Sequence, residues 1–462
     1  MLFHVLGIGP VGTLIAHHLR HVLDERHSVV LIHKHLAQMR RTRKMGSEVI
    51  VERDGIRTLS SGFRSEVSDT QKQQREDQLN AQRVRKAEIR ARYSDDLTDG
   101  DNSSKETHLI HPPSGTIESL IVTTKAQSVT PAIQQLLPRI GPNSTIVLLN
   151  NGMGVYENLL QYIFRNPEQR PHFILATNDH GAFLKGYMHC VHAGIGAIKF
   201  GIVPDPWGRD FEASASSGGQ LSLKDIMEHD DDERYFSLRN TVAVLSSLSA
   251  LNASWVPFSS VMTAIKRKLV VNSVINPLTA IMGCRNGDVF TSDAANRICR
   301  RVCMEAEWVF SAEYAAQEGL TKNLFISSRG DRRLPVVPSA LKGESLEEEV
   351  KRVASITTGN VSSMLADIQK GKHTEIDFMN GHLLRMGLDY KVHMPTTATL
   401  LNLIKMREAI PLDPSLLAGK QNTCKDVLGY AAGTFSLIKI PLADFSADLY
   451  DEQLELDEEL ST

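Results

Sequence analysis

The sequence lacks the long apolar runs of membrane proteins and the charge excess of nucleic-acid-binding proteins. No apolar run approaches the roughly 20 residues of a transmembrane helix. The strand-like segment LFHVLGIG begins at residue 2, so we expect no signal or transit peptide. The formal net charge is −3, which provides no positive field for nucleic acid. We therefore expect a cytoplasmic protein that binds a small molecule and binds neither nucleic acid nor a membrane.

Cysteine is also scarce, with five residues, no C-x-x-C pair and an odd count that argues against a disulfide framework. Cys299 and Cys303 share a helix face, but two thiols without further ligands do not make a zinc site. His17, His18 and His21 lie on the first predicted helix without carboxylates at ligand spacing. We expect packed or surface histidines there, and no metal.

The length of 462 residues exceeds what one hydrophobic core usually supports, and it predicts two domains. Short apolar strands alternate with helical segments up to about residue 256, which predicts an α/β fold with a doubly wound parallel sheet of Rossmann type. After Pro257 the helical period dominates and predicts an all-α domain. The expected organisation is a Rossmann domain (1–256) with a charged insertion (about 64–106) and a loop insertion (about 203–235), a helical domain (257–446) and an acidic tail (447–462).

Local patterns predict individual elements within this plan. Residues 48–63 are typical of a β-hairpin with Asp54-Gly55 at its turn. Residues 189–201 alternate in a way that indicates antiparallel strands. Helical periodicity covers 258–283, 293–318, 345–370, 373–389 and 394–409.

A glycine-rich turn, Gly7-Ile8-Gly9-Pro10-Val11-Gly12, directly follows the first apolar strand and opens a helix. This context is typical of a dinucleotide fingerprint. The first glycine makes the tight turn, the second lets the backbone approach the pyrophosphate, and the third lets helix and strand pack closely. The helix N-terminus then offers free N–H groups to the phosphates.

The end of the second strand, LIHKHLAQMRR, indicates which dinucleotide is bound. An NAD-binding protein usually places an acid there to hold the ribose 2′-hydroxyl, and this segment has none. Lys34, Arg40 and Arg41 instead offer cations for a 2′-phosphate, although any one of them could simply be a solvated basic residue. We therefore expect NADP(H).

The segment AIKRKLVVNSVINPLTAIMGCRNG (264–287) places Lys268, Asn272 and Asn276 four residues apart in mostly apolar surroundings. Residues at this spacing share one helix face. A stripe facing water is the ordinary explanation, but asparagine is a poor interior helix residue and here recurs at helix period. Pro277 should kink or end the helix where the stripe ends. We interpret the stripe as part of a site.

Together with segments further along the chain, these residues resemble the ketopantoate reductase family. The similarity follows chain order through GIGPVG (7–12), VTTKAQSV (122–129), NNGMG (150–154), KLVVNSVINPLTAI (268–281), the NG at 286–287 and SSMLADIQKGKHTEID (362–377). The insertions and the C-terminal extension are departures that interrupt no motif, and with them the chain resembles the long, fungal-type members of that family. The resemblance implies NADPH-dependent reduction of 2-dehydropantoate to (R)-pantoate, a step of pantothenate and coenzyme A biosynthesis, and C-terminal helices like those of 6-phosphogluconate dehydrogenase.

The resemblance also implies a role for each matching residue. Lys268 would donate a proton and Glu375 would close the site near it. The implied substrate-binding residues are Asn272, Asn276, Asn286 and Ser363. The implied cofactor contacts, beside the glycine turn, are Lys34, Lys125, Asn151 and Ala182, and lysine at position 34 keeps the charge of the expected arginine without its bidentate fork.

Three alternatives remain open on the sequence. The chain could reduce another 2-oxo acid, act as a 3-hydroxy acid dehydrogenase of the same plan, or bind NADP without catalysis as a regulatory protein. The last alternative predicts eroded catalytic positions, and none is eroded. The oligomeric state is open as well, with a homodimer as one option.

Overall fold

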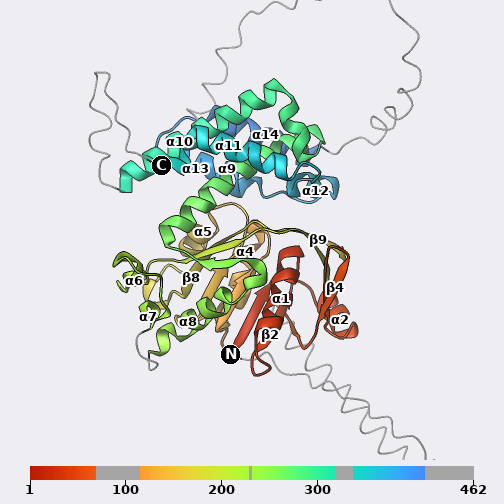
Figure 1. The fold of residues 1–462 in the computed structure, drawn as a ribbon, viewed down its shortest axis with the longest axis vertical. Helices are drawn as coiled ribbons and strands as arrows, with labels where there is room; N and C mark the ends of the chain where they lie inside the picture. Colours follow the sequence, from red (N-terminus) through yellow and green to blue (C-terminus); the bar gives the residue numbers. More distant parts are fainter. Residues whose placement is uncertain (69–114, 228–231, 318–336, 411–462) are drawn as a thin grey trace, which may run out of the picture. The chain divides into compact units, whose positions relative to one another are not determined.

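The computed structural model describes residues 1–68, 115–227, 232–317 and 337–410 (Figure 1). An eight-stranded sheet forms the centre of its N-terminal part, and only β11 runs antiparallel to its neighbour β8, all other neighbouring pairs being parallel. In spatial order the strands are β12 (Ala253–Trp255), β11 (Ile198–Ile202), β8 (His172–Asn178), β7 (Thr145–Leu148), β6 (Ser119–Val122), β1 (Leu2–Leu6), β2 (Ser28–His33) and β5 (Arg64–Val67). The apolar runs of β1, β2 and β6 suit strands that are buried on both faces.

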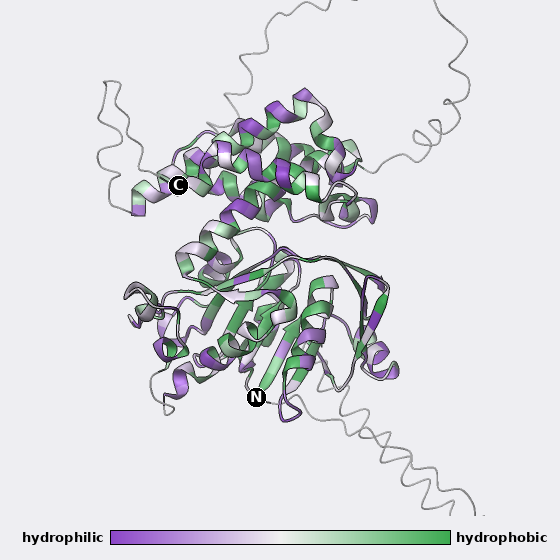
Figure 2. Ribbon diagram, viewed as in Figure 1, coloured by the Kyte–Doolittle hydropathy of each residue, from purple (hydrophilic) through white to green (hydrophobic). Residues whose placement is uncertain are grey.

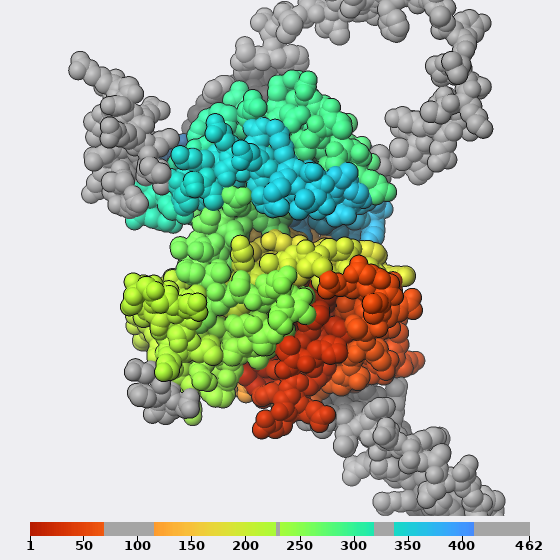
Figure 3. Space-filling view, in the orientation of Figure 1, coloured from red at the N-terminus to blue at the C-terminus, as the bar shows by residue number. Residues whose placement is uncertain are grey.

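Helices cover both faces of this sheet. Val5 belongs to a core shared with α1 (Pro10–Val22) and α8 (Glu233–Ser246), whereas its neighbour Leu6 belongs to a second core shared with α4 (Val129–Leu136) and α5 (Val155–Tyr162). Successive strand residues point to opposite faces, so the sheet is doubly wound. Figure 3 shows the green atoms of α8 at the surface beside the red atoms of α1.

A second, four-stranded sheet packs against α1. Its strands are β4 (Ile56–Ser60), β3 (Val49–Arg53), β10 (His189–Gly194) and β9 (Gly181–Gly186), in that spatial order. The expected hairpin at 48–63 is confirmed, since β3 and β4 are antiparallel and Asp54 and Gly55 both have positive φ. The expected antiparallel strands at 189–201 are confirmed as β10 and β11.

The C-terminal part is helical and has a core of its own. Its helices are α9 (Phe258–Met282), α10 (Asp293–Gln317), α11 (Gly343–Ile356), α12 (Ser363–Gln369), α13 (Asn380–Asp389) and α14 (Pro395–Ala409). Hydrophobic residues are concentrated in the central strands and on inward helix faces (Figure 2). The predicted fold class, an α/β Rossmann-type part followed by an all-α part, is therefore confirmed.

Several predicted boundaries need correction. Residues 64–67 of the expected charged insertion form strand β5, which pairs in parallel with β2, and the Glu66 side chain pairs with Arg139 at 2.8 Å. Residue 68 follows β5. Residues 69–114, which include the rest of that insertion, lie outside the described residues, as do the acidic tail and Cys424. The expected loop at 203–235 contains α6 (Ala213–Ser216), α7 (Leu223–Ile226) and the start of α8. Ser222 and Asp225 form a capping box that explains α7.

The predicted helices at 345–370 and 373–389 are also corrected. The first is two helices, α11 and α12, separated by a turn around Gly359, and the second begins only at Asn380. The division into domains at residue 256 remains a prediction, with β12 ending at Trp255 and α9 beginning at Phe258. No helix among the described residues combines the length and apolarity that a membrane span requires.

The helix α9 does not end at Pro277, contrary to one of the two expected outcomes. It continues through the proline to Met282. Proline removes the backbone donor that would bind the carbonyl of Ser273, four residues earlier. The side-chain amide of Asn380 donates to that carbonyl instead, at 3.1 Å. A partner from outside the helix therefore replaces the missing hydrogen bond.

Candidate active site

The predicted dinucleotide turn lies between the carboxyl end of β1 and the start of α1. Gly7 has φ +98°, and a Cβ there would clash with Thr124 after β6. A Cβ on Gly12 would clash with the carbonyl oxygen of Gly7, which already accepts a hydrogen bond from Thr123 Oγ1 at 2.6 Å. Gly9, by contrast, faces open space, and no side chain caps the helix after it. The turn is therefore closed on its protein side and open where a phosphate group would approach.

The same edge of the sheet carries polar residues at the ends of further strands. The order of strands reverses between β1 and β6, and ligands of such sheets bind at the carboxyl ends near that point. Lys125 follows β6 and pairs with Asp367 at 2.5 Å. Asn150 and Asn151 follow β7, and Asn150 donates to the carbonyl of Thr124. The predicted cofactor residues Lys125 and Asn151 thus share one edge with the glycine turn.

The remaining predicted cofactor residues lie on β9 and after β2. Lys34 follows β2 directly and is exposed. Arg41, one of the two further cations considered at this strand end, stacks on the Tyr187 ring at 4.3 Å. Ala182 on β9 packs against the same core as Ile8 and Val11.

The stripe on α9 does not face water. Lys268, Asn272 and Asn276 lie on one continuous helix, as predicted. Asn276 is 7% exposed and donates to Met379 Sδ at 3.6 Å. The Lys268 side chain is 26% exposed, and Asn272 is half-buried. The observed burial rules out a fully solvated stripe.

Lys268 reaches the carboxyl end of β8. Its ammonium donates to the backbone carbonyl of Asn178 and lies 3.8 Å from the Asp179 carboxylate. Burial lowers the pKa of Lys268, while Asp179 and Glu375 act to raise that pKa.

Glu375 lies beside the loop that follows β6. Its carboxylate accepts a hydrogen bond from the backbone N–H of Ala126 at 2.9 Å, and the residue is 8% exposed. Burial raises the pKa of Glu375, opposed by the Ala126 hydrogen bond, Lys125 and Asn151. Glu375 therefore links the C-terminal segment to two predicted cofactor residues.

Two predicted substrate residues stand apart from this group. Asn286 on the 3-10 helix Asn286–Thr291 donates to Thr357 Oγ1 at 3.0 Å and is 8% exposed. Ser363 begins α12 and is exposed. Within the described part of the chain, neither side chain forms a hydrogen bond with Lys268 or Glu375.

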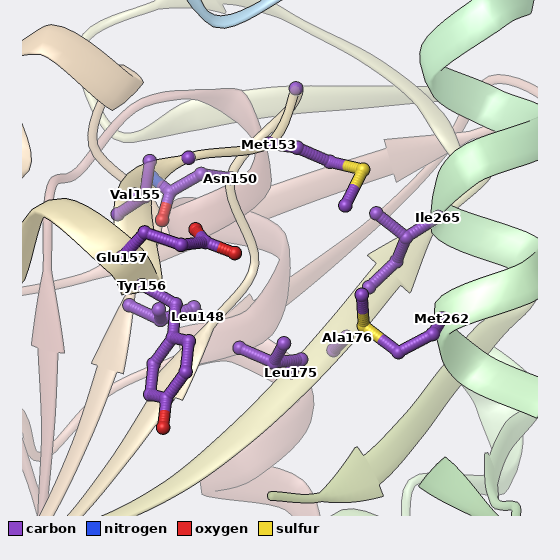
Figure 4. Close-up of a pocket in the computed structure, with 12 residues that line it drawn as sticks. Leu148, Asn150, Met153, Val155, Tyr156, Glu157, Leu175, Ala176, Met262 and Ile265 are labelled. Atoms are coloured by element: carbon purple, nitrogen blue, oxygen red, sulfur yellow. The ribbon is translucent and has the colours of Figure 1, made fainter. Parts of the chain in front are cut away.

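Two adjoining pockets lie at the ends of β7 and β8. The first contains Lys268 and is lined by Asn150, Asn151, Gly152, Ala176, Thr177, Ile265 and Leu269. The second shares Asn150, Gly152, Ala176 and Ile265 with it and is mainly apolar. Figure 4 shows Met153 and Ile265 pointing into that second pocket from the loop and from α9, with the Glu157 carboxylate directed toward them. The lysine therefore lines a pocket with the Asn150–Gly152 loop.

Sequence reasoning missed Asn178, Asp179 and Asn150. Asn178 ends β8, Asp179 follows it, and Asn150 lies just after β7; polar residues at such strand ends were a usable signal. Of the three histidines on α1, His17 forms hydrogen bonds with Ser60 at 3.0 Å and Thr58 at 3.1 Å, and its ring contacts those of His18 and His21. No three His, Cys, Asp or Glu side chains are grouped as metal ligands in the described ranges.

Asp179→Asn is expected to shift the alkaline limb of activity to lower pH. Asp179 acts to raise the pKa of Lys268, so the neutral amide lets that pKa fall further. If protonated Lys268 is the active form, activity is present below its pKa and is lost as pH rises through it. The measurement is kcat against pH for both proteins. An alkaline limb that stays in place, or moves upward, contradicts the coupling.

Comparisons with known proteins match nearly the whole described chain. A family model described as "Ketopantoate reductase PanE/ApbA" matches residues 3–205, and one described as "Ketopantoate reductase PanE/ApbA C terminal" matches residues 260–408. The 2-dehydropantoate 2-reductase of Yersinia pestis is 30% identical over 297 residues, which cover 63% of this chain and 75% of the relative. The probable 2-dehydropantoate 2-reductase of Schizosaccharomyces pombe is 26% identical, with 63% and 74% covered.

Among solved structures, the probable 2-dehydropantoate 2-reductase of Bacillus subtilis superposes with a TM-score of 0.52 at 20% identity, covering 88% of this chain and all of that one. At this identity the structure supports the fold alone. The two family models follow each other in chain order and span both parts of the structure, and the Yersinia pestis relative is matched over three quarters of its length. The chain therefore belongs to the ketopantoate reductase family of oxidoreductases.

Proposed function

We propose that this protein reduces 2-dehydropantoate to pantoate with NADPH, using Lys268 as the proton donor. The observation that carries the proposal is the position of Lys268. Its ammonium enters a pocket formed by the Asn150–Gly152 loop, at the sheet edge that also holds the Gly7–Gly12 turn. A cation, amide groups and a phosphate-binding turn at one edge suit the reduction of a charged keto acid.

The residues present fit a nicotinamide dinucleotide. The open space beside Gly9 and the uncapped start of α1 leave room and N–H donors for a pyrophosphate. Lys34, exposed at the end of β2, would attract the 2′-phosphate of NADP, and no acid follows in residues 35–47. When bound, the cofactor supplies the hydride.

Lys268 would supply both charge and proton. Hydride addition to a ketone carbon leaves negative charge on its oxygen, and an ammonium beside that oxygen stabilises the charge and then donates a proton. Burial lowers the pKa of Lys268, which makes it a better acid near neutrality. Asp179 and Glu375 oppose that shift and keep the ammonium charged before reaction.

Asn272 and Asn276 would orient the substrate from the same helix face. Asn276 Nδ2 donates to Met379 Sδ, so we assign the amide oxygen of Asn276 as the acceptor for a substrate hydroxyl. Glu375, held by Ala126, would close the site beside Lys125 and Asn151. We assign Asn286 and Ser363 to the outer part of the substrate. Asn286 follows the end of α9, and Ser363 adjoins Ser362, which contacts Thr279 near that end.

Asn276→Ala is expected to raise KM for the keto acid about fivefold to tenfold with little change in kcat. One hydrogen bond to a hydroxyl contributes on the order of 1 kcal/mol, and it is similar in the ground and transition states. Steady-state rates at varied keto acid check this. A fall in kcat at constant KM would instead assign Asn276 to the chemical step.

A panel of 2-oxo acids with NADPH and with NADH tests the function. We expect the highest kcat/KM for 2-dehydropantoate with NADPH. A higher value for another branched 2-oxo acid would support the alternative substrate class. No turnover of any acid, with NADPH binding retained, would support a non-catalytic NADP-binding protein.

A further inference from the structure

A proline inside α9 leaves one buried carbonyl without its helical donor. Pro277 has no N–H, so the carbonyl of Ser273 cannot form the usual bond within α9. Ser273 is fully buried, so water cannot replace the lost donor. A buried carbonyl without a partner is strongly unfavourable, so this turn of α9 depends on a donor from elsewhere.

Asn380 supplies that donor. It is the first residue of α13, it is fully buried, and its Nδ2 lies 3.1 Å from the Ser273 oxygen. Its neighbour Met379 accepts the hydrogen bond from Asn276. The short segment from Glu375 to Asn380 therefore contacts α9 at two points, on Ser273 and on Asn276, within one helical turn.

This arrangement joins two parts of the candidate site that are far apart in sequence. Glu375 stands at one end of the segment and contacts Ala126, while Asn380 stands at the other end and contacts α9. In a helix without proline, the Ser273 carbonyl would already be bound by the N–H of residue 277. Pro277 thus leaves that carbonyl available to the side chain of Asn380.

We propose that Asn380 is a positioning residue. It donates to the Ser273 carbonyl, which Pro277 leaves without a helical donor, and thereby fixes Asn276 against the segment that carries Glu375. The inference rests on the proposed function, because it acts through a proposed substrate residue. Only a side chain that donates a hydrogen bond fills this role, which distinguishes asparagine from the isosteric aspartate.

The pairing is tested by a cycle of Asn380→Ala, Asn380→Asp, Pro277→Ala and the double variant Asn380→Ala/Pro277→Ala. Both Asn380 variants should melt at least about 2 °C below the unaltered protein, because a buried carbonyl loses its donor. Pro277→Ala restores a backbone N–H at residue 277. The double variant should therefore recover part of the loss that Asn380→Ala shows alone. A double variant that melts no higher than Asn380→Ala overturns the pairing.

The positioning role is tested by kinetics of the same variants. Asn380→Ala should raise KM for 2-dehydropantoate about fivefold, with a smaller effect on kcat, and Pro277→Ala should restore KM in the double variant. In an Asn276→Ala background, Asn380→Ala should add nothing further to KM. A lower melting temperature with unchanged KM means a structural role only, and it overturns the inference, as does an additive effect with Asn276→Ala.

The failure of the proposed function can be distinguished from the failure of the positioning role. An unaltered protein that turns over none of the 2-oxo acids contradicts the proposed function. The melting cycle needs no turnover and still decides whether Asn380 and Pro277 act as a pair. Binding of 2-dehydropantoate measured by calorimetry then replaces KM, and an affinity unchanged by Asn380→Ala overturns the positioning role.

Discussion

Replacing Lys268 by alanine is expected to lower kcat for 2-dehydropantoate at least about 10²- to 10⁴-fold, the range that general acid catalysis contributes. The variant loses the proton and also the charge that stabilises the developing alkoxide. The backbone carbonyl of Asn178 and the carboxylate of Asp179, which Lys268 contacts, are left without it. Steady-state rates with saturating NADPH measure the effect.

Folding should survive this substitution. Burial lowers the pKa of Lys268, so the charged form is less favourable in the folded state than in the unfolded state. Removing the lysine removes that cost, and we expect a melting temperature that is unchanged or slightly higher. A large fall in the melting temperature would mean that lost activity reflects unfolding.

Two matched variants separate charge from proton transfer. Lys268→Arg keeps a cation whose proton is held too tightly to be donated, so it should recover substrate affinity without recovering kcat. Lys199→Ala removes an exposed lysine on β11 and should change neither parameter. Normal turnover in Lys268→Ala, with a normal melt, contradicts the proposed role.

Lys34→Glu is expected to reduce the preference for NADPH over NADH by about 10- to 100-fold. A charge-assisted hydrogen bond contributes about 1.5–3 kcal/mol, and each 1.4 kcal/mol is a factor of ten. The glutamate removes the attraction to the 2′-phosphate, adds repulsion, and offers an acceptor to the 2′-hydroxyl of NADH. The measurement is kcat/KM for each cofactor at saturating keto acid.

Lys44→Glu is the control for this change. It introduces the same charge difference at the far end of α2 (Leu36–Lys44), away from the end of β2. Long-range effects of charge are screened by salt over about 10 Å at 0.1 M, so this variant should keep its cofactor preference. Equal kcat/KM for NADPH and NADH in the unaltered protein would contradict the NADP assignment.

The features that sequence predicted well are set by neighbours along the chain. The Gly7–Gly12 turn needs only a strand before it and a helix after it, and the structure shows why Gly7 and Gly12 must lack a Cβ. The Lys268, Asn272 and Asn276 stripe follows from helix period alone. Its burial does not, because it depends on Met379 and β8, which the helix meets only in the folded chain.

The features that sequence missed depend on distant partners. Strand β5 is polar, yet its Glu66 is buried, and the partner of this carboxylate, Arg139, lies more than seventy positions away. Pro277 predicted a kink or an end to α9, whereas Asn380, about a hundred residues later, supplies the missing hydrogen bond. Asp179 reaches Lys268 only because β8 ends beside α9. In each case the structure depends on a contact between residues far apart in the sequence, which a local sequence pattern does not contain.

The most direct test of the central claim is the stoichiometry of a single reaction mixture. The unaltered protein is incubated with NADPH and 2-dehydropantoate, the loss of reduced nicotinamide is followed by its absorbance, and pantoate is quantified in the same sample. We expect one pantoate for each NADPH oxidised, and we expect both reactions to be nearly abolished in Lys268→Ala. NADPH oxidation without pantoate, or no reaction in a folded protein that binds NADPH, would contradict the central claim.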